Sequence, residues 1–424
     1  MAGPIRINLP HGRMQNTKPK PAKSNFTIFR QICQTIPGYL TTTIARELGV
    51  EAESRTLSHW SHTCSMIFAQ IAHSQSLNDL CDSLDVESTA LKTIRGATAP
   101  SRNGLSHANR NRNADFAETL YWRTEAHLKT NHPKFGPEHG KKNFAYRFKC
   151  PINVVDATTI PLVANCMDWA KHRRRKAGIK CHCRLDLHSY LPNFVLVDTA
   201  AEHENTRARE VCAGLKAGEI VVFDKGYIDF EHLHDLHLRG VFWVTRAKDS
   251  TAYLVERTLN KPAGNTLRDV VIRFEHYNSK QAYPDELRLV EARVEIDGQS
   301  TVMTFITNHL QWQPQSVADL YRCRWQIELF FKSLKQNLQV ADFLGYNANA
   351  VRWQIWTALL VHLILRFLAW QSRWSSSFGR VFTLLRATLW RRLDLKSLLK
   401  LYGTAGANKR IRTRPEQAFL PGIC

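Results

Sequence analysis

Apolar residues recur at three- and four-residue spacing through the first third of the chain. The segments NFTIFRQICQTI, LTTTIARELGV, TLSHWSHTCSMIFAQIAHS and SLNDLCDSL follow this pattern, which is typical of amphipathic helices. Ser76, which opens the last segment, has a side chain suited to a helix N-cap. A polar connector rich in Arg and Asn then precedes another helical segment, FAETLYWRTEAHL. We therefore predict an N-terminal helical domain over residues 25–135.

The pattern changes to strands near residue 145. The run FAYRFKCPINVVDATTIPLV is β-branched and apolar, and IKCHCRLDLHSYLPNFVLVDTA holds two strand-like runs around a YLPN turn. The helix TRAREVCAGL, the strand EIVVFDKGY, the helix DFEHLHDLHLRG and the strand VFWVTRA follow in that order. This succession predicts an α/β fold with a mixed sheet flanked by helices.

The predicted α/β core is interrupted once. Residues 251–308 are rich in strand patterns such as LRLVEARVEIDG and contain no strong helical segment. Helical spacing resumes with SVADLYRCRWQIELFFKSLKQNL. We therefore predict a mostly β insertion domain at 251–308 between two parts of one core, 145–250 and 309–390.

Charge adds the first indication of function. The chain has 58 Lys and Arg against 37 Asp and Glu, a net charge of +21, which favours a polyanionic partner such as nucleic acid. A cationic membrane protein would have the same balance. The apolar run at 355–370 is interrupted by His362 and Arg366 and falls short of the roughly 20 apolar residues that span a membrane. We interpret it as a buried helix and expect no membrane partner.

The two ends of the chain and two internal motifs are less specific. Residues 1–24 are basic and Pro-rich, lack the apolar segment of a signal peptide and are predicted to form a disordered arm. The basic segment 391–424 could bind DNA or end in disorder, and KHRRRK at 171–176 could line DNA or form a solvated loop. In CHC, Cys181 and Cys183 share one face of a strand. Because zinc sites usually use C-x2-C spacing, we interpret them as reduced cytosolic thiols and not as zinc ligands.

Three acids stand out by their positions. Asp156 ends the apolar run INVVD and Asp224 ends IVVFD, which places both at the C-terminal edge of the sheet, where open α/β sheets bind ligands. Glu328 lies on a predicted helix. Cleavage of a phosphodiester by two metal ions needs hard oxygen ligands that hold two Mg²⁺ roughly 3.5–4 Å apart. Taken singly, each Asp is more often a turn former or a helix cap, and Glu328 an ion-pair partner.

The segment YRCRWQIELFFKSLKQNL is predicted to be one helix with cations around its acid. Offsets of three, four and seven residues separate its key positions: Tyr321, Arg324, Glu328 and Lys335. Such offsets keep side chains on one face of a helix, and Lys332 joins that face four residues after Glu328. Cations on both sides of a carboxylate suit a phosphate backbone that runs past a metal site.

The same spacing resembles a known family. Tyr321-x2-Arg324-x3-Glu328-x6-Lys335 matches without a gap the Y-(2)-R-(3)-E-(6)-K signature of the DDE transposases of insertion-sequence family four. The segments VVDATTIPL and VFDKGYID resemble those that carry the first and second catalytic Asp of that family, and FWVTRAK resembles the strand that follows. The N-terminal helices are similar to the helical domain of one branch. The resemblance spans roughly residues 25–375.

The resemblance implies an RNase H-like catalytic core. Asp156, Asp224 and Glu328 would be its catalytic triad and would bind two Mg²⁺ ions, with Mn²⁺ able to substitute. It also implies a set of contacts to transposon-end DNA phosphates, from Tyr321, Arg324, Lys332 and Lys335. In relatives a tryptophan stacks on a flipped base near the cleavage site, and the candidates here are Trp312 and Trp325, either of which could instead be a core residue.

The function implied is cut-and-paste DNA transposition, with a DNA hairpin as an intermediate, as in relatives. The implied partners are terminal inverted repeats, target DNA and a second copy of the chain in a synaptic complex, and the implied location is the bacterial cytosol at the nucleoid. Two alternatives stay open. One is a different two-metal nuclease on the same fold, such as a resolvase, and the other is a non-enzymatic DNA-binding protein descended from a transposase.

Overall fold

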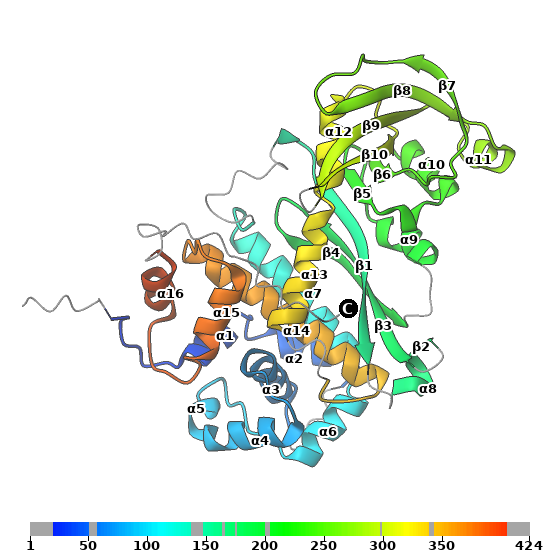
Figure 1. Cartoon of the computed structure of the whole chain (residues 1–424). Helices are drawn as coiled ribbons and strands as arrows, with labels where there is room; N and C mark the ends of the chain where they lie inside the picture. Colours follow the sequence, from blue (N-terminus) through cyan, green and yellow to red (C-terminus); the bar gives the residue numbers. More distant parts are fainter. Residues whose placement is uncertain are drawn as a thin grey trace, which may run out of the picture.

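The computed structural model (Figure 1) describes residues 20–50, 57–136, 147–162, 166–173, 176–199, 204–296, 299–338 and 343–404. Most of the predicted basic arm and the end of the basic C-terminal segment therefore lie outside the described residues. The last part of the arm lies along the chain that precedes the final helix, where the Asp394 N–H donates to the Ala22 carbonyl at 2.8 Å and the Ser24 N–H donates to the Arg392 carbonyl at 3.2 Å.

Helices fill the described part of the N-terminal region, as the apolar spacing predicts. They are α1 (Ile28–Cys33), α2 (Leu40–Glu47), α3 (His59–Ala72), α4 (Leu77–Val86), α5 (Ser88–Lys92), α6 (Arg102–Asn111) and α7 (Asp115–Asn131). Ser76 caps α4, because its side chain accepts a hydrogen bond from the Asp79 N–H at 3.1 Å. The predicted N-cap is confirmed.

A mixed sheet forms the centre of the molecule. Its first strands are β1 (Ile152–Leu162), β2 (Lys171–Arg173), β3 (Lys176–Asp186), β4 (Leu191–Thr199), β5 (Ile220–Phe223) and β6 (Phe242–Arg246). In space the order is β4, β3, β1, β5, β6. β3 is antiparallel to both β4 and β1, whereas β5 is parallel to β1 and β6. This is the arrangement of an RNase H-like sheet, and the predicted fold class is confirmed.

The hairpin of β3 and β4 turns earlier than the sequence predicts. The predicted turn is YLPN, but β3 ends at Asp186 and β4 already begins at Leu191. The turn therefore comprises residues 187–190. Tyr190 takes a left-handed conformation with φ of 55°, which a non-glycine residue adopts only where its surroundings hold it. The Asp186 carboxylate helps, because it accepts hydrogen bonds from the backbone N–H groups of His188 and Ser189.

Helices cover both faces of the sheet. On one face, α9 (Glu204–Cys212) and α10 (Phe230–Leu238) bury Val211 and Leu236 against Val155 and Val221 of the strands. On the opposite face, a second and larger buried cluster contains Val154 of β1 together with apolar residues of the helices that follow residue 313. Because side chains alternate along a strand, Asp156 lies on the same face as Val154.

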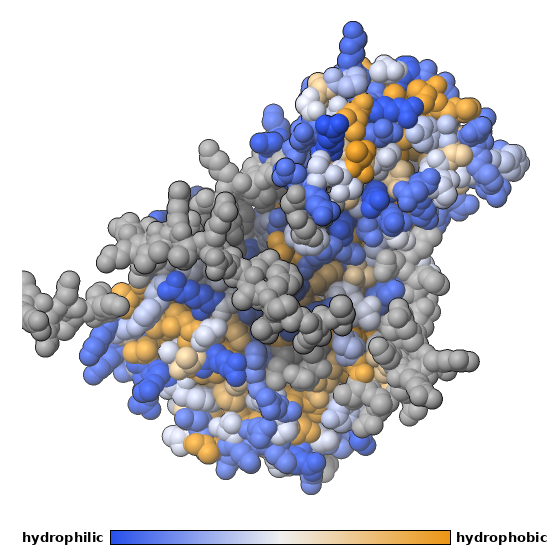
Figure 2. All heavy atoms as spheres, viewed as in Figure 1, coloured by the Kyte–Doolittle hydropathy of each residue, from blue (hydrophilic) through white to orange (hydrophobic). Residues whose placement is uncertain are grey.

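The insertion strands continue the same sheet. They are β7 (Tyr253–Thr258), β8 (Thr266–Phe274), β9 (Leu287–Ile296) and β10 (Gln299–Thr307), with the short helix α11 (Tyr277–Ala282) between β8 and β9. β10 pairs antiparallel with β6, so the order runs on from β6 through β10, β9 and β8 to β7. Figure 2 shows a mainly hydrophilic surface over this region, with a few hydrophobic residues.

The segment predicted as a single helix is divided in two, and that prediction is wrong. α12 (Pro314–Arg322) ends before α13 (Trp325–Asn337) begins. At the junction, backbone hydrogen bonds span three residues, as from the Arg324 N–H to the Tyr321 carbonyl at 2.9 Å. Such bonds tighten the turn relative to an α-helix. In Figure 1, α12 lies beside the insertion strands and α13 runs from it across the sheet towards the later helices.

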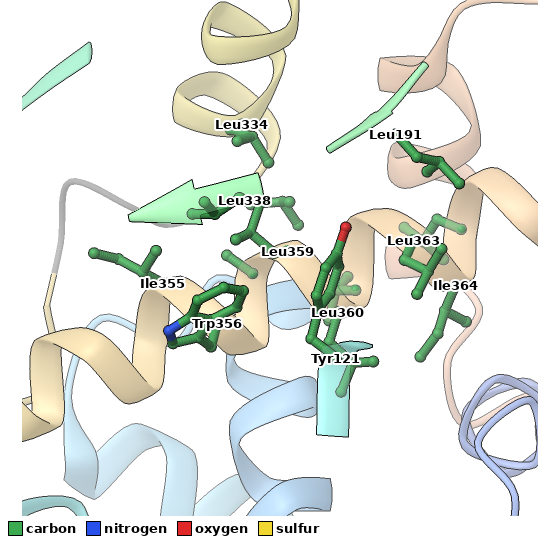
Figure 3. Packing of buried hydrophobic residues seen from close by; sticks show 14 of the residues in the cluster. Tyr121, Leu191, Leu334, Leu338, Ile355, Trp356, Leu359, Leu360, Leu363 and Ile364 are labelled. Carbon is green, nitrogen blue, oxygen red and sulfur yellow. The ribbon is translucent and has the colours of Figure 1, made fainter. Parts of the chain in front are cut away.

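The long apolar helix α14 (Ala348–Gln371) is the axis of the larger buried cluster. Its length and hydropathy would allow a membrane span, but 83% of its most apolar window is buried inside the protein, so the predicted buried helix is confirmed. Figure 3 shows its Trp356, Leu359 and Leu363 among side chains from α7, α13 and β4. The N-terminal helices α3, α6 and α7 pack on α14 and therefore share a core with the sheet. α15 (Phe378–Arg386) and α16 (Leu395–Thr404) complete the described helices.

Candidate active site

The first two acids are brought together by the pairing of two parallel strands. In the register of β1 and β5, Val155 lies opposite Phe223, so Asp156 and Asp224 each follow this pair by one residue. Asp224 leaves β5 with extended backbone angles and precedes a single 3-10 turn, η4 (Lys225–Tyr227). The expected placement of both carboxylates at one edge of the parallel strands is therefore what the structure has.

The third acid reaches the same place from α13. Arg324, at the N-terminus of this helix, contacts two acids at once: its guanidinium lies 3.3 Å from Asp156 Oδ2 and 2.7 Å from Glu328 Oε1. The remaining acid is contacted from α12, where the Tyr321 hydroxyl donates to Asp224 Oδ1 at 3.2 Å. Residues from β1, the end of β5, α12 and α13 thus meet in one cluster. We call Asp156, Asp224, Glu328, Tyr321 and Arg324 the acidic cluster.

Burial is uneven within the acidic cluster. The side chains of Asp156 and Arg324 are 15% and 17% exposed, whereas that of Glu328 is 34% exposed. Burial followed by the charge of Asp224 raises the pKa of Tyr321 to about 12, which keeps its hydroxyl protonated as a donor. Burial alone would lower the pKa of Arg324, but the oxygens of Tyr321, Glu328, Asp156 and Asp224 together raise it above its ordinary value.

The chemistry of the acidic cluster fits a hard divalent cation. Its three acids offer only oxygen ligands, which Mg²⁺ and Mn²⁺ prefer in proteins. Within the described ranges, no three His, Cys, Asp or Glu side chains stand close enough together to hold a metal as they are. In the acidic cluster, Arg324 contacts the carboxylates of both Asp156 and Glu328.

The other predicted site residues lie around this cluster in different settings. Lys332 is exposed. Lys335 donates from Nζ to the Thr159 carbonyl of β1 at 2.9 Å, and burial lowers the pKa of this lysine. Trp325 is 53% exposed beside the acidic cluster. Trp312 is half-buried, and its ring stacks on that of His309 with centroids 3.9 Å apart and an interplanar angle of 6°.

Two contacts near the acidic cluster could not be predicted from the sequence. Buried His182 of β3 lies with Nδ1 3.2 Å from the hydroxyl of Tyr227, the last residue of the turn after Asp224. The Tyr190 hydroxyl donates to Gln326 Oε1 at 2.7 Å and ties the β3–β4 turn to α13. The strand pattern places His182 opposite its neighbouring cysteines, but no sequence signal pairs it with Tyr227, since the two residues meet only through the sheet.

Comparison with known protein families gives this geometry a context. A family model described as the transposase DDE domain matches residues 148–364, which is more than half of the chain. The chain belongs to the transposase DDE domain family. The matched range contains all three acids and most of the described strands. A second model, for a domain of unknown function, matches residues 24–94 in the N-terminal helical region.

Several curated relatives are about a quarter identical to this chain over the segments that align. A Sinorhizobium fredii protein named transposase y4zB is 28% identical over 63% of this chain and 74% of its own length. The protein named as the transposase of insertion sequence element IS5377 from Geobacillus stearothermophilus is 28% identical over 54% of this chain and 59% of its own. Transposase InsG of insertion sequence element IS4 from Escherichia coli is 23% identical over 45% of this chain and 43% of its own length.

Among solved structures, one match is a piggyBac transposase synaptic complex with hairpin DNA, at 10% identity and a TM-score of 0.41 over 92% of this chain and 86% of that one. Family membership rests on the sequence comparisons. DDE transposases cut DNA and transfer its strands, and they generally use divalent metal ions. The chain is thus an insertion-sequence transposase, and the family predicted from the signature is confirmed.

Proposed function

We propose that Asp156, Asp224 and Glu328 are the catalytic residues of cut-and-paste transposition and that they hold two Mg²⁺ ions, or Mn²⁺ in their place. The observation that carries this proposal is the convergence of the three carboxylates on Arg324 and Tyr321. Bound ions would activate the attacking oxygen and stabilise the leaving oxygen. The side chains themselves would fix where those ions lie, since they come from paired strands and a packed helix.

The proposed reaction begins with a nick at the transposon end. Water attacks a phosphodiester there, and the bond to the 3′ oxygen breaks to leave a 3′-hydroxyl. That hydroxyl attacks the opposite strand and forms a hairpin, which water reopens before the hydroxyl attacks target DNA. Each step exchanges one phosphodiester bond for another or hydrolyses it, so no further reactant is required.

Cations and aromatic residues around the acids would hold the DNA. We assign phosphate contacts to Tyr321, Arg324, Lys332 and Lys335. Lys332 is exposed beside Glu328, so a phosphate could reach its ammonium without rearrangement of the protein. Of the two tryptophans, Trp325 has the exposed ring that stacking on an unpaired base requires. Trp312 would have to leave its stack with His309.

The remaining assignments follow from the reaction. The substrates are the terminal inverted repeats of an element and its target DNA, and the N-terminal helical region contributes to recognition of the repeats. Joining two ends requires two active sites, so we propose a homodimer in the synaptic complex. The bacterial cytosol, where the nucleoid lies, is the expected location. Strong dependence of binding on salt should accompany the net charge of +21.

The test compares two glutamate variants of the full chain on DNA that carries the element's ends. Glu328→Gln removes a proposed catalytic carboxylate, and Glu275→Gln makes the same change at an exposed position in the insertion region. With Mg²⁺, we expect nicking by Glu328→Gln to fall at least about 100-fold, the scale of losing one electrostatic element of an active site, while end binding persists.

Three outcomes would contradict parts of this proposal. If the wild-type chain binds the ends but never nicks them, the chain is a DNA-binding descendant without activity. If it cuts without regard to the ends, a different nuclease function on the same fold is favoured. If Glu328→Gln cuts as well as Glu275→Gln, Glu328 is not catalytic.

A further inference from the structure

Arg324 has an unusual position for a residue assigned to DNA binding. Its guanidinium lies between two of the acids, 3.3 Å from Asp156 Oδ2 and 2.7 Å from Glu328 Oε1, and its carbon centre is 5.7 Å from the centroid of the Tyr321 ring. The side chain is only 17% exposed. Its Nε is buried without a hydrogen-bond partner among the described residues. The free chain therefore directs this cation towards the carboxylates.

The contacts of Arg324 place it in competition with a metal ion. The guanidinium donates to Asp156 Oδ2 and forms an ion pair with Glu328 Oε1, two carboxylates that a divalent cation would need as ligands. A guanidinium stays charged at any physiological pH, so it leaves these oxygens only by moving. Negative charge from the acids also favours its presence, because three carboxylates in a partly buried site repel one another unless a cation lies among them.

We propose that Arg324 is the resting counter-ion of the acidic cluster and limits metal binding until DNA phosphate draws its guanidinium away from Asp156 and Glu328. This inference rests on the proposed function, since it takes the three acids as metal ligands. A phosphate offers a guanidinium the same bidentate acceptor geometry as a carboxylate. DNA would then strengthen metal binding, and by linkage metal would strengthen DNA binding equally. The site would be assembled for cleavage only when a substrate is present.

The neighbouring Arg322 provides a matched control. It lies two residues away, at the end of α12, but its side chain is 67% exposed and pairs with Asp319 at 3.1 Å. Its contacts do not include the acidic cluster in any described interaction. Changing either arginine to glutamine removes one positive charge from nearly the same place in the chain. A difference between the two variants therefore reports contact with the acids and not net charge.

The experiment measures Mn²⁺ affinity on the full chain without DNA, by electron paramagnetic resonance and calorimetry. We expect Arg324→Gln to bind Mn²⁺ at least tenfold more tightly than the wild-type chain and Arg322→Gln to resemble the wild type. The measurement is then repeated with a duplex that already ends at the cleavage position, so that no bond is cut. This duplex should tighten Mn²⁺ binding by the wild type tenfold or more and should change the affinity of Arg324→Gln by less than threefold.

Equal or weaker Mn²⁺ binding by Arg324→Gln would overturn the proposal and would make Arg324 a scaffold for the acids or a DNA contact alone. If that variant does not fold, as judged by its thermal unfolding, Arg324→Lys replaces it. A lysine keeps the charge but cannot donate in the same forked geometry, so tighter binding than wild type is still expected and unchanged binding would overturn the proposal. Nicking of end DNA by the wild type is scored separately, so failure of this inference leaves the proposed function standing, and failure to nick removes both.

Discussion

At the scale of single residues, the sequence predicts where the three acids lie in the fold but not which residues support them. Asp156, Asp224 and Glu328 are recognisable because each ends an apolar run or lies among cations in a specific spacing. Their neighbours are not, because His182 and Tyr227 are far apart in the chain and meet only when β3 and β5 enter one sheet. The periodicity of apolar residues assigns a side chain to one face of a strand or helix, but it does not identify the residue that packs against that side chain.

The contact of His182 with Tyr227 gives a prediction about stability. Tyr227→Phe removes one buried hydroxyl and leaves His182 Nδ1 without that partner, while its Nε2 already has none among the described residues. An unsatisfied buried polar group lowers the free energy of unfolding by about 1–3 kcal/mol. Urea unfolding should show this loss, whereas Tyr277→Phe, whose ring is 72% exposed, should be nearly neutral. Equal effects of the two variants would contradict the assigned role.

At the scale of elements, strand and helix order is predictable and the exact ends are not. The order of strands and helices from β1 to β6 follows from the apolar runs and their length. The division between α12 and α13 cannot be predicted in this way, since the apolar spacing of the sequence continues across the junction. The turn of the β3–β4 hairpin also differs from the predicted one, because Leu191 and Pro192 pair with β3 although a proline commonly marks a turn.

The insertion strands are joined to the loop that leads into α12 by a buried ion pair. Arg288 of β9 and Asp269 of β8 lie 2.7 Å apart with fully buried side chains. The guanidinium also donates to the carbonyls of Leu310 and Trp312, in the loop that leads into α12. This pair thereby fixes the start of the helix that carries Tyr321.

Removing one partner of this ion pair should destabilise the protein more than removing both partners. Arg288→Met leaves the Asp269 charge buried without its partner and should lower the free energy of unfolding by about 3–5 kcal/mol. The double variant Asp269→Leu with Arg288→Met should recover most of that loss, because no charge stays buried. Chemical denaturation of both variants measures the difference. A double variant as unstable as Arg288→Met would show that the loop contacts, and not the ion pair, dominate.

At the scale of the whole molecule, composition predicts the class of partner but not the shared core. The net charge indicates a polyanion, and the apolar run within α14 is correctly read as buried. Nothing in the pattern shows that α14 packs against both the N-terminal helices and the helix that carries Glu328. That packing depends on which apolar faces meet, and many faces in this chain have similar composition.

Buried and half-buried histidines predict how the whole fold responds to acid. Burial, as the largest cause, lowers the pKa of a group of them to about 3 or 4, namely His59, His62, His182, His232, His309 and His362. Unfolding returns each to about 6.5, so below that pH the unfolded chain binds more protons than the folded chain. The free energy of unfolding should therefore fall as pH drops from about 6.5 towards 4, by up to about 1.4 kcal/mol per pH unit for each histidine.

A pair of variants tests this acid response. His62 is fully buried, and its Nε2 lies 2.8 Å from Asn109 Oδ1, whereas His107 is exposed. Between pH 6 and 5, His62→Gln should reduce the slope of unfolding free energy against pH by about 1.4 kcal/mol per pH unit, which corresponds to one proton. His107→Gln should reduce this slope by much less. The slope comes from denaturant titrations at several pH values. Identical slopes for the two variants would show that His62 does not contribute.

The central claim is that the three acids form one metal-binding catalytic site on DNA. The most direct test is anomalous X-ray diffraction from crystals of the full chain bound to a transposon-end duplex and soaked in Mn²⁺. We predict two manganese peaks roughly 3.5–4 Å apart, within bonding distance of carboxylate oxygens of Asp156, Asp224 and Glu328. Peaks at other residues, or ordered DNA at this site with no manganese beside the acids, would contradict the account.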